Sequence, residues 1–224
     1  MNKISENLKE IRSQLPENVQ LVCVSKFHPQ EMIMQAYKCG ERDFAESRAQ
    51  ELLLKEQNLP KDIRWHFIGP LQSNKIKQIV GFIHLIQSME NEKLLEETNR
   101  CAKKINRKIN VLLEVHIAQE EQKHGFSADD ILAFFQNKKY ENYPFVEICG
   151  LMGIATFTDN KQQIENEFIN INQTFNSTKN IYHNEKFQFL SIGMSDDCQT
   201  AIKHNSTMVR IGSRIFGNRI YPNS

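Results

Sequence analysis

The stretch Phe187–Gly217, FQFLSIGMSDDCQTAIKHNSTMVRIGSRIFG, decides both the fold and the place of a ligand site. Its apolar start, residues 187–192, predicts a buried strand, and a short helix is expected over residues 197–204. A second strand is expected over residues 207–211, with a turn directly after it at Gly212 and Ser213. The turns that follow these two strands are therefore expected to lie close together.

The ends of these two strands carry residues that suit an anion. Gly193, Gly212 and Ser213 let backbone N–H groups approach a ligand closely, Ser191 adds a hydroxyl, and Arg210 adds a permanent positive charge. The pattern favours a phosphate-bearing ligand. Two ordinary strand-to-helix turns remain the alternative on these residues alone.

The rest of the chain repeats the same alternation of strand and helix. Ile4, Leu8, Ile11 and Leu15 predict an amphipathic helix at the N-terminus. Further strands are expected at residues 20–25, 42–45, 64–68, 82–87, 110–117 and 145–152, with helices at 29–38, 46–56, 74–80, 91–106, 128–136, 161–175 and 213–216. Eight strand–helix units without a linker predict an α/β fold: one (β/α)8 TIM-type barrel domain over residues 1–224, with an extra N-terminal helix.

Composition excludes several classes of function. The 28 Lys and Arg residues balance 27 Asp and Glu residues, for a net charge of +1, so there is no basic footprint for nucleic acid. The five cysteines include no C-x-x-C pair, and the seven histidines show no metal-binding spacing. No apolar stretch is long enough to span a membrane, and no signal peptide is evident, so we expect a cytoplasmic protein.

Lys26 follows the first expected strand, at the end of a barrel where active sites lie. A neutral lysine amine condenses with an aldehyde to form an imine. With a phosphate site at the same edge, Lys26 suggests either pyridoxal phosphate or a Schiff-base aldolase acting on a sugar phosphate. A surface lysine is the plainer alternative. Met89, Met152 and Met194, near strand ends, are expected to form walls around an aromatic ring.

Four segments carry a resemblance to a known family: VSK (24–26), WHFIGPLQSNK (65–75), ICGLMGIA (148–155), and SIGMSDD with STMVRIGSRIFG (191–197 and 206–217). They resemble the pyridoxal phosphate homeostasis proteins along nearly the whole chain. The resemblance implies a barrel similar to the cofactor domain of alanine racemase, of fold-type III.

The resemblance also implies roles for single residues. The position of Lys26 would carry the cofactor and that of Arg210 would face the pyridine nitrogen. Positions matching Ser191, Gly212 and Ser213 would surround the phosphate, with Thr207 a weaker candidate. Two residues depart from the family pattern: Ser47 stands where an asparagine near the cofactor is usual, and Asn205 where a glycine is usual.

Two classes of function remain open at this point. One is a carrier that stores pyridoxal 5'-phosphate and passes it to apo forms of enzymes that use it. The other is an amino-acid racemase. An arginine at the pyridine nitrogen weakens the ring as an electron sink, and the chain ends at Ser224 with no second domain expected to close the site. The carrier is therefore favoured, as a monomer or weak dimer.

Overall fold

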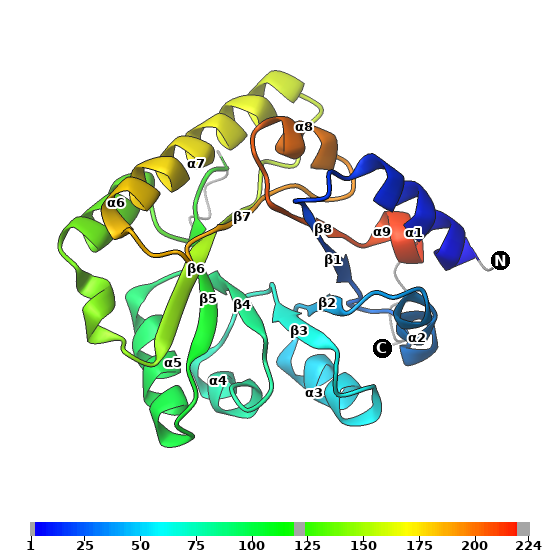
Figure 1. Ribbon diagram of the computed structural model, residues 1–224, viewed down its shortest axis with the longest axis horizontal. Coiled ribbons are helices and arrows are strands. Elements are labelled where there is room, and N and C mark those ends of the chain that lie inside the picture. The colour runs from blue at the N-terminus through cyan, green and yellow to red at the C-terminus, as the bar shows by residue number, and fades with distance from the viewer. Residues whose placement is uncertain (1–2, 119–123, 219–224) are drawn as a thin grey trace.

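The computed structural model describes residues 3–118 and 124–218, and within them eight parallel strands form a closed barrel surrounded by helices (Figure 1). The strands pair in chain order, and the first pairs with the last, with Gln20 opposite Met208. The strands are β1 (Gln20–Val24), β2 (Asp43–Glu46), β3 (Arg64–Phe67), β4 (Leu85–Met89), β5 (Ile109–Val115), β6 (Val146–Gly153), β7 (Phe189–Ser191) and β8 (Met208–Ile211). The predicted (β/α)8 barrel is confirmed.

Helices cover the outside of the barrel (Figure 1). They are α1 (Lys3–Gln14), α2 (Gln30–Lys38), α3 (Ala49–Asn58), α4 (Ser73–Ile79), α5 (Glu92–Lys104), α6 (Ala128–Gln136), η1 (Lys139–Asn142, a 3₁₀ turn), α7 (Lys161–Tyr182), α8 (Cys198–Lys203) and α9 (Ser213–Phe216). The extra helix α1 lies beside α9, and the Nδ2 of Asn7 donates to the carbonyl of Ile215 (3.0 Å). None of the helices that the structure describes is long and apolar enough to cross a bilayer.

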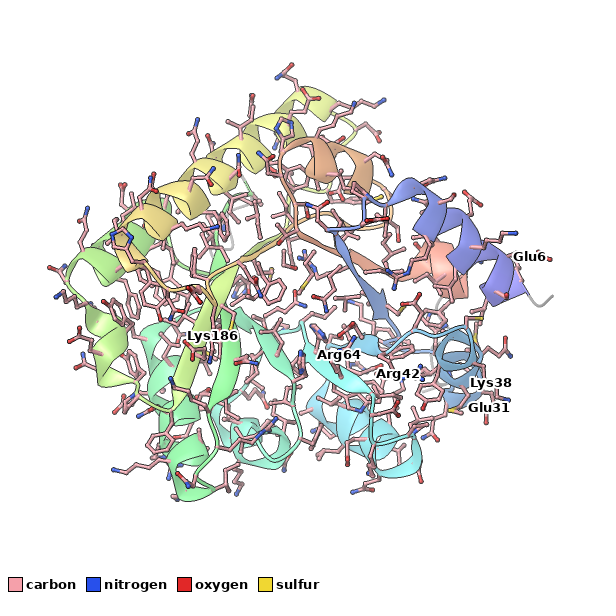
Figure 2. All side chains as sticks on the ribbon, viewed as in Figure 1. Glu6, Glu31, Lys38, Arg42, Arg64 and Lys186 are labelled. Carbon is pink, nitrogen blue, oxygen red and sulfur yellow. The ribbon has the colours of Figure 1, made fainter. Side chains whose placement is uncertain are left out.

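The strands divide the apolar side chains into two layers, because successive residues of a strand point to opposite faces. A small cluster fills the inside of the barrel: Val22, Ala45, Leu85, Leu112, Cys149, Met152 and Met208. The alternate residues, such as Cys23 and Phe44, belong to the larger core between barrel and helices. Charged residues of the helices, such as Glu6 and Lys38, lie on the solvent side (Figure 2).

Several element boundaries differ by a few residues from those expected, and two of these differences have a clear structural cause. The strand predicted at 82–87 is β4, shifted to Leu85–Met89, because Ile83 accepts a hydrogen bond from Arg107 and donates one to Ile79 at the end of α4. The helix predicted at 161–175 continues to Tyr182. The ring of Tyr182 packs edge-on against Phe187 at 5.8 Å between centroids, so the longer helix buries an additional aromatic side chain.

Candidate functional site at the carboxyl end of the barrel

The turns after β1, β2, β7 and β8 lie at one edge, because all strands of the barrel run in the same direction. Lys26 lies in the turn after β1 and is half-buried. It comes two residues after Val24, whose side chain packs against the interior cluster. Ser47, also half-buried, directly follows β2. Of the predicted residues, these two and the turns described below share the mouth of the barrel.

Arg210 is a buried cation near the end of β8, with 3% of its surface exposed. Its Nη1 donates to both the carbonyl and the hydroxyl of Ser191, each at 2.7 Å, and its Nη2 donates to the carbonyl of Gly153 (2.9 Å). Among the residues that the structure describes, no acceptor bonds its Nε. Burial lowers the pKa of Arg210 to about 10, partly offset by the charges of Asp197 and Glu114, so the guanidinium stays positive at pH 7.

Gly212 and Ser213 form the turn between β8 and α9. A side-chain carbon on Gly212 would come within 3.0 Å of the carbonyl oxygen of Val24, so this turn packs directly on the end of β1. The Oγ of Ser213 donates to the Oγ of Ser195 in the turn after β7 (3.0 Å). The amides of Ile215 and Phe216 donate to the carbonyl of Gly212 (2.9 Å each), whereas those of Ser213 and Arg214 have no acceptor within α9. The turn thus sits next to the segment that leads to Lys26.

The turn after β7 requires a glycine. Gly193 has φ +93°, and a side-chain carbon there would lie 2.6 Å from the Cβ of Ala201. Met194, which follows, is 37% exposed and lines an open cleft of about 890 Å³ at the carboxyl ends of β5, β6 and β7. Glu114 also lines this cleft, and burial, reinforced by the negative charge of Glu90, raises its pKa to about 7.

Two predicted residues do not lie where the resemblance implied. Thr207 precedes β8 and therefore lies at the amino end of the barrel, where its carbonyl accepts from Gln20 and its hydroxyl accepts from Leu190. The prediction of a phosphate contact by Thr207 is wrong, because the strand carries it to the opposite edge from Gly212. Ser191 is fully buried, and its hydroxyl donates to Gln87 while accepting from Arg210. Ser191 therefore holds the guanidinium of Arg210 in place through its carbonyl and its hydroxyl.

A buried ion-pair network around the Lys26 turn was missed by sequence reasoning. The Nζ of Lys55 donates to Glu46 (2.8 Å), to Glu51 (2.6 Å) and to the carbonyl of Ser25 (2.9 Å). Glu51 also accepts from the backbone N–H of Phe27 (2.7 Å), whose φ is +65°. The network therefore holds the residues on both sides of Lys26. Its one signal in the sequence is the i, i+4 spacing of a glutamate and a lysine on α3.

Glu46 is the most deeply buried member of that network. The Ser25 hydroxyl donates to its Oε1 (2.5 Å), while its Oε2 has no partner among the described residues. Burial raises the pKa of Glu46 to about 7, although the Lys55 cation acts in the opposite direction. Its full burial and its contacts mark Glu46 as part of the support of the turn.

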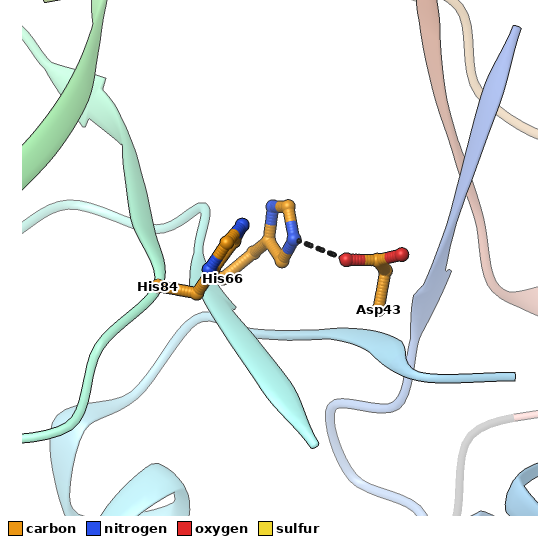
Figure 3. Close-up of side chains that lie close together, drawn as sticks. All are labelled: Asp43, His66 and His84. Atoms are coloured by element: carbon orange, nitrogen blue, oxygen red, sulfur yellow. Dashed lines mark hydrogen bonds and ion pairs between the residues drawn. The ribbon is translucent and has the colours of Figure 1, made fainter. Parts of the chain in front are cut away.

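A second cluster of polar side chains, which the sequence spacing of the histidines did not indicate, lies at the amino end of the barrel (Figure 3). Asp43, His66 and His84 offer ligand atoms within 4.8 Å of one another. The carboxylate of Asp43 already accepts from Arg64 (2.8 and 2.5 Å) and from His66 (3.2 Å). These bonds hold the pKa of Asp43 well below its usual range despite burial. The cluster is a satisfied ion pair at the end remote from Lys26.

Comparison with known proteins places the whole fold in a family. Residues 1–220 match the family model described as alanine racemase, N-terminal domain. A pyridoxal phosphate homeostasis protein of Haemophilus influenzae is 37% identical over 92% of this chain and 87% of its own length. The human protein of the same name is 31% identical over 99% of this chain and 86% of its own length.

Solved structures give the same picture. PipY of Synechococcus elongatus without PLP superposes with a TM-score of 0.89 at 33% identity, over 96% of this chain and all of PipY. PipY with PLP bound superposes with a TM-score of 0.86 at 32% identity, over the same shares. An alanine racemase of Clostridium difficile shares the fold, with a TM-score of 0.77 at 13% identity over 99% of this chain and 58% of that one.

The barrel, the turn that bears Lys26 and the relatives all agree with the family that the sequence motifs suggested. The chain belongs to the pyridoxal phosphate homeostasis protein family, within the alanine racemase N-terminal domain class of barrels.

Proposed function

We propose that this chain binds pyridoxal 5'-phosphate through Lys26 and Arg210 and takes part in homeostasis of that cofactor, without robust catalysis of its own. The observation that carries the proposal is the buried Arg210 cation, whose Nε has no acceptor among the described residues. A PLP-bound relative at 32% identity supports the choice of ligand. The names of the relatives support the role in homeostasis.

The residues present fit the cofactor at both of its ends. The Nε–H of Arg210, which bonds to no acceptor in the described part of the chain, suits an acceptor such as a pyridine nitrogen. Gly212 and Ser213 offer first-turn amides and a hydroxyl to a phosphate beside the end of β1. Met194, which lines the cleft, is proposed as a wall of the site, and Ser47, which directly follows β2, as a polar contact.

Lys26 is proposed as the covalent anchor. When bound, the cofactor supplies an aldehyde, whose oxygen leaves as water when the lysine amine forms a C=N bond to its carbon. The contacts of Ser25 and Phe27 with Lys55 and Glu51 hold the backbone on both sides of this amine. A fixed backbone leaves only the side chain of Lys26 to be positioned for this reaction.

Arg210 is compatible with a carrier, although an arginine at this position does not by itself exclude a racemase. A guanidinium has no lone pair with which to accept a proton, so it donates to an unprotonated pyridine nitrogen. Its pKa, near 10 in this buried position, keeps it charged at pH 7. An unprotonated ring withdraws electrons weakly, which disfavours carbanion chemistry. We propose apo forms of enzymes that use the cofactor as its recipients.

The test is the absorbance spectrum of the purified protein after addition of pyridoxal phosphate, before and after borohydride. We expect a yellow protein that borohydride bleaches, with the reduced adduct on Lys26 in peptide mapping. Lys26→Ala should abolish the band, and Lys38→Ala, an exposed lysine on α2, should leave it unchanged. Retention of the band in Lys26→Ala would refute the anchor. Rapid racemisation of added L-amino acids would refute the non-catalytic role.

A further inference from the structure

A chain of hydrogen bonds runs through the inside of the barrel from Arg210 to the opposite end. It passes through the hydroxyl of Ser191, the amide of Gln87 and the ring of His66, and ends on Asp43. The links measure 2.7, 2.7, 2.9 and 3.2 Å. Five strands contribute one residue each, and every residue lies on the interior side of its strand: β8, β7, β4, β3 and β2.

Burial makes each link of the chain obligatory. Ser191, Gln87 and His66 have no exposed surface, while Asp43 and Arg210 expose 6% and 3%. A buried polar group without a partner costs more than its hydrogen bond contributes. Of the apolar residues around the chain, Met208 accepts a hydrogen bond from the Nε2 of Gln87 through its sulfur (3.4 Å). Each polar side chain of the chain therefore has a hydrogen-bond partner inside the barrel.

The donors in the chain all point the same way. Arg210 donates to Ser191, and the hydroxyl of Ser191 then donates to Oε1 of Gln87. The Nε2 of Gln87 carries two hydrogens and no lone pair, so it donates to Nδ1 of His66. His66 consequently carries its proton on Nε2 and donates that proton to Asp43 (Figure 3).

The two ends carry opposite charges that favour this direction. Arg210 is the cation from which the donors start, and the Asp43 carboxylate is the anion on which they end. Arg64, at the start of β3 (Figure 2), donates to Asp43 through Nε and Nη2 and keeps it anionic. Hydrogen bonds aligned in this way polarise one another and strengthen the chain.

We propose that Gln87, His66 and Asp43 are positioning residues for Arg210, which fix the guanidinium at the cofactor-facing end through Ser191. The inference rests on the proposed function, since it assumes that Arg210 meets the ring of pyridoxal phosphate. Ser191 fixes one nitrogen of the guanidinium, and Gln87 fixes the hydroxyl of Ser191. The pair Asp43–Arg64 anchors the far end of the same chain of hydrogen bonds.

The first experiment measures the tautomer of His66 in the protein without cofactor. Nitrogen-15 NMR distinguishes Nε2–H from Nδ1–H imidazoles, and His66→Phe identifies the signal. We expect Nε2–H in the native protein. Gln87→Glu keeps an acceptor for Ser191 but offers no donor to Nδ1, so the Nε2–H form of His66 with an unprotonated Nδ1 should disappear. An Nδ1–H tautomer in the native protein would overturn the chain, whether or not pyridoxal phosphate binds.

The second experiment measures the dissociation constant of pyridoxal phosphate by absorbance titration. Gln87→Leu should weaken binding about tenfold, as expected from one misplaced charge-assisted hydrogen bond, while borohydride still fixes the cofactor to Lys26. Leu112→Ala, inside the same barrel but outside the chain, should lower stability and leave the dissociation constant unchanged.

The outcomes separate this inference from the proposed function. Unchanged affinity in Gln87→Leu would overturn the positioning role and leave the carrier intact, whereas a native protein that binds no pyridoxal phosphate would overturn the carrier. If Gln87→Leu does not fold, Gln87→Glu tests the same link: loss of the Nε2–H form of His66 together with weaker binding supports the inference, whereas a retained Nε2–H form or a native affinity refutes it.

Discussion

Replacement of Lys55 by methionine tests whether the buried network beneath the Lys26 turn stabilises the barrel. Methionine keeps most of the side-chain volume of a residue that is 4% exposed, so the change removes charge and hydrogen bonds and creates little cavity. Three bonds are lost: those to Glu46, to Glu51 and to the carbonyl of Ser25. The carboxyl of Glu46, which has no exposed surface, then has no neighbouring cation bonded to it.

Removing one partner of a buried ion pair costs about 3–5 kcal/mol, which for a chain of this length lowers Tm by roughly 6–20 °C. The loss should depend on pH in a definite direction. Because burial raises the pKa of Glu46 to about 7, its carboxyl is mainly neutral at pH 5.5 and mainly ionised at pH 8. A neutral carboxyl needs no cation, so the destabilisation should be larger at pH 8 than at pH 5.5.

The assay is urea unfolding of the protein without cofactor at both pH values, with Lys61→Met as the matched control. Lys61 pairs with Glu56 at 2.7 Å, but its side chain is 66% exposed, and such pairs contribute at most about 1 kcal/mol. If Lys55→Met lost no more stability than Lys61→Met, or lost the same amount at both pH values, the network would not hold the turn as argued.

Three further results are expected. Gly193→Ala should cost about 2–4 kcal/mol in urea unfolding, because it combines a left-handed φ with an overlap on Ala201, whereas Gly81→Ala, in open space, should stay within about 0.5 kcal/mol. Glu114 has a raised pKa of about 7, so the folded state binds its proton more tightly than the unfolded state and stability should fall from pH 5 to pH 8. Glu114→Gln should remove as much as about 3 kcal/mol of that fall, and an unchanged pH profile would refute the assignment. Iodoacetamide at neutral pH should alkylate one cysteine of the folded protein, the exposed Cys39; a second rapid site in the mass spectrum would contradict the burial of the others.

The barrel could be predicted from the sequence because its signals are local and repeated. Each apolar run is followed by a turn and a helical pattern, and such alternation leaves a parallel sheet as the arrangement. Lys26 and Arg210 could be placed for the same reason, since parallel strands bring their ends to one edge. Strand direction also places Thr207 at the other edge, so its assignment to the phosphate came from the resemblance and disagreed with the predicted fold.

The rest of the site depends on contacts between distant strands that no local pattern contains. The hydroxyl of Ser191 donates a hydrogen bond to Gln87, which lies 104 residues earlier in the chain. The orientation of α3 about its axis decides whether the side chain of Lys55 faces solvent or Glu46. The sequence around Lys55 is compatible with both orientations. The start of β4 at Leu85 depends likewise on Arg107, because its guanidinium donates a hydrogen bond to the carbonyl of Ile83, just before that strand.

The pairing of the first strand with the last has a consequence for how the protein is made. Gln20 meets Met208 across the seam, and the turn at Gly212 packs against Val24. A chain emerging from the ribosome carries Lys26 early, but the strand that completes its surroundings is translated near the end. Contacts so far apart in sequence form slowly. A nascent chain therefore carries Lys26 long before it has Arg210, and the proposed site is complete only in the finished barrel.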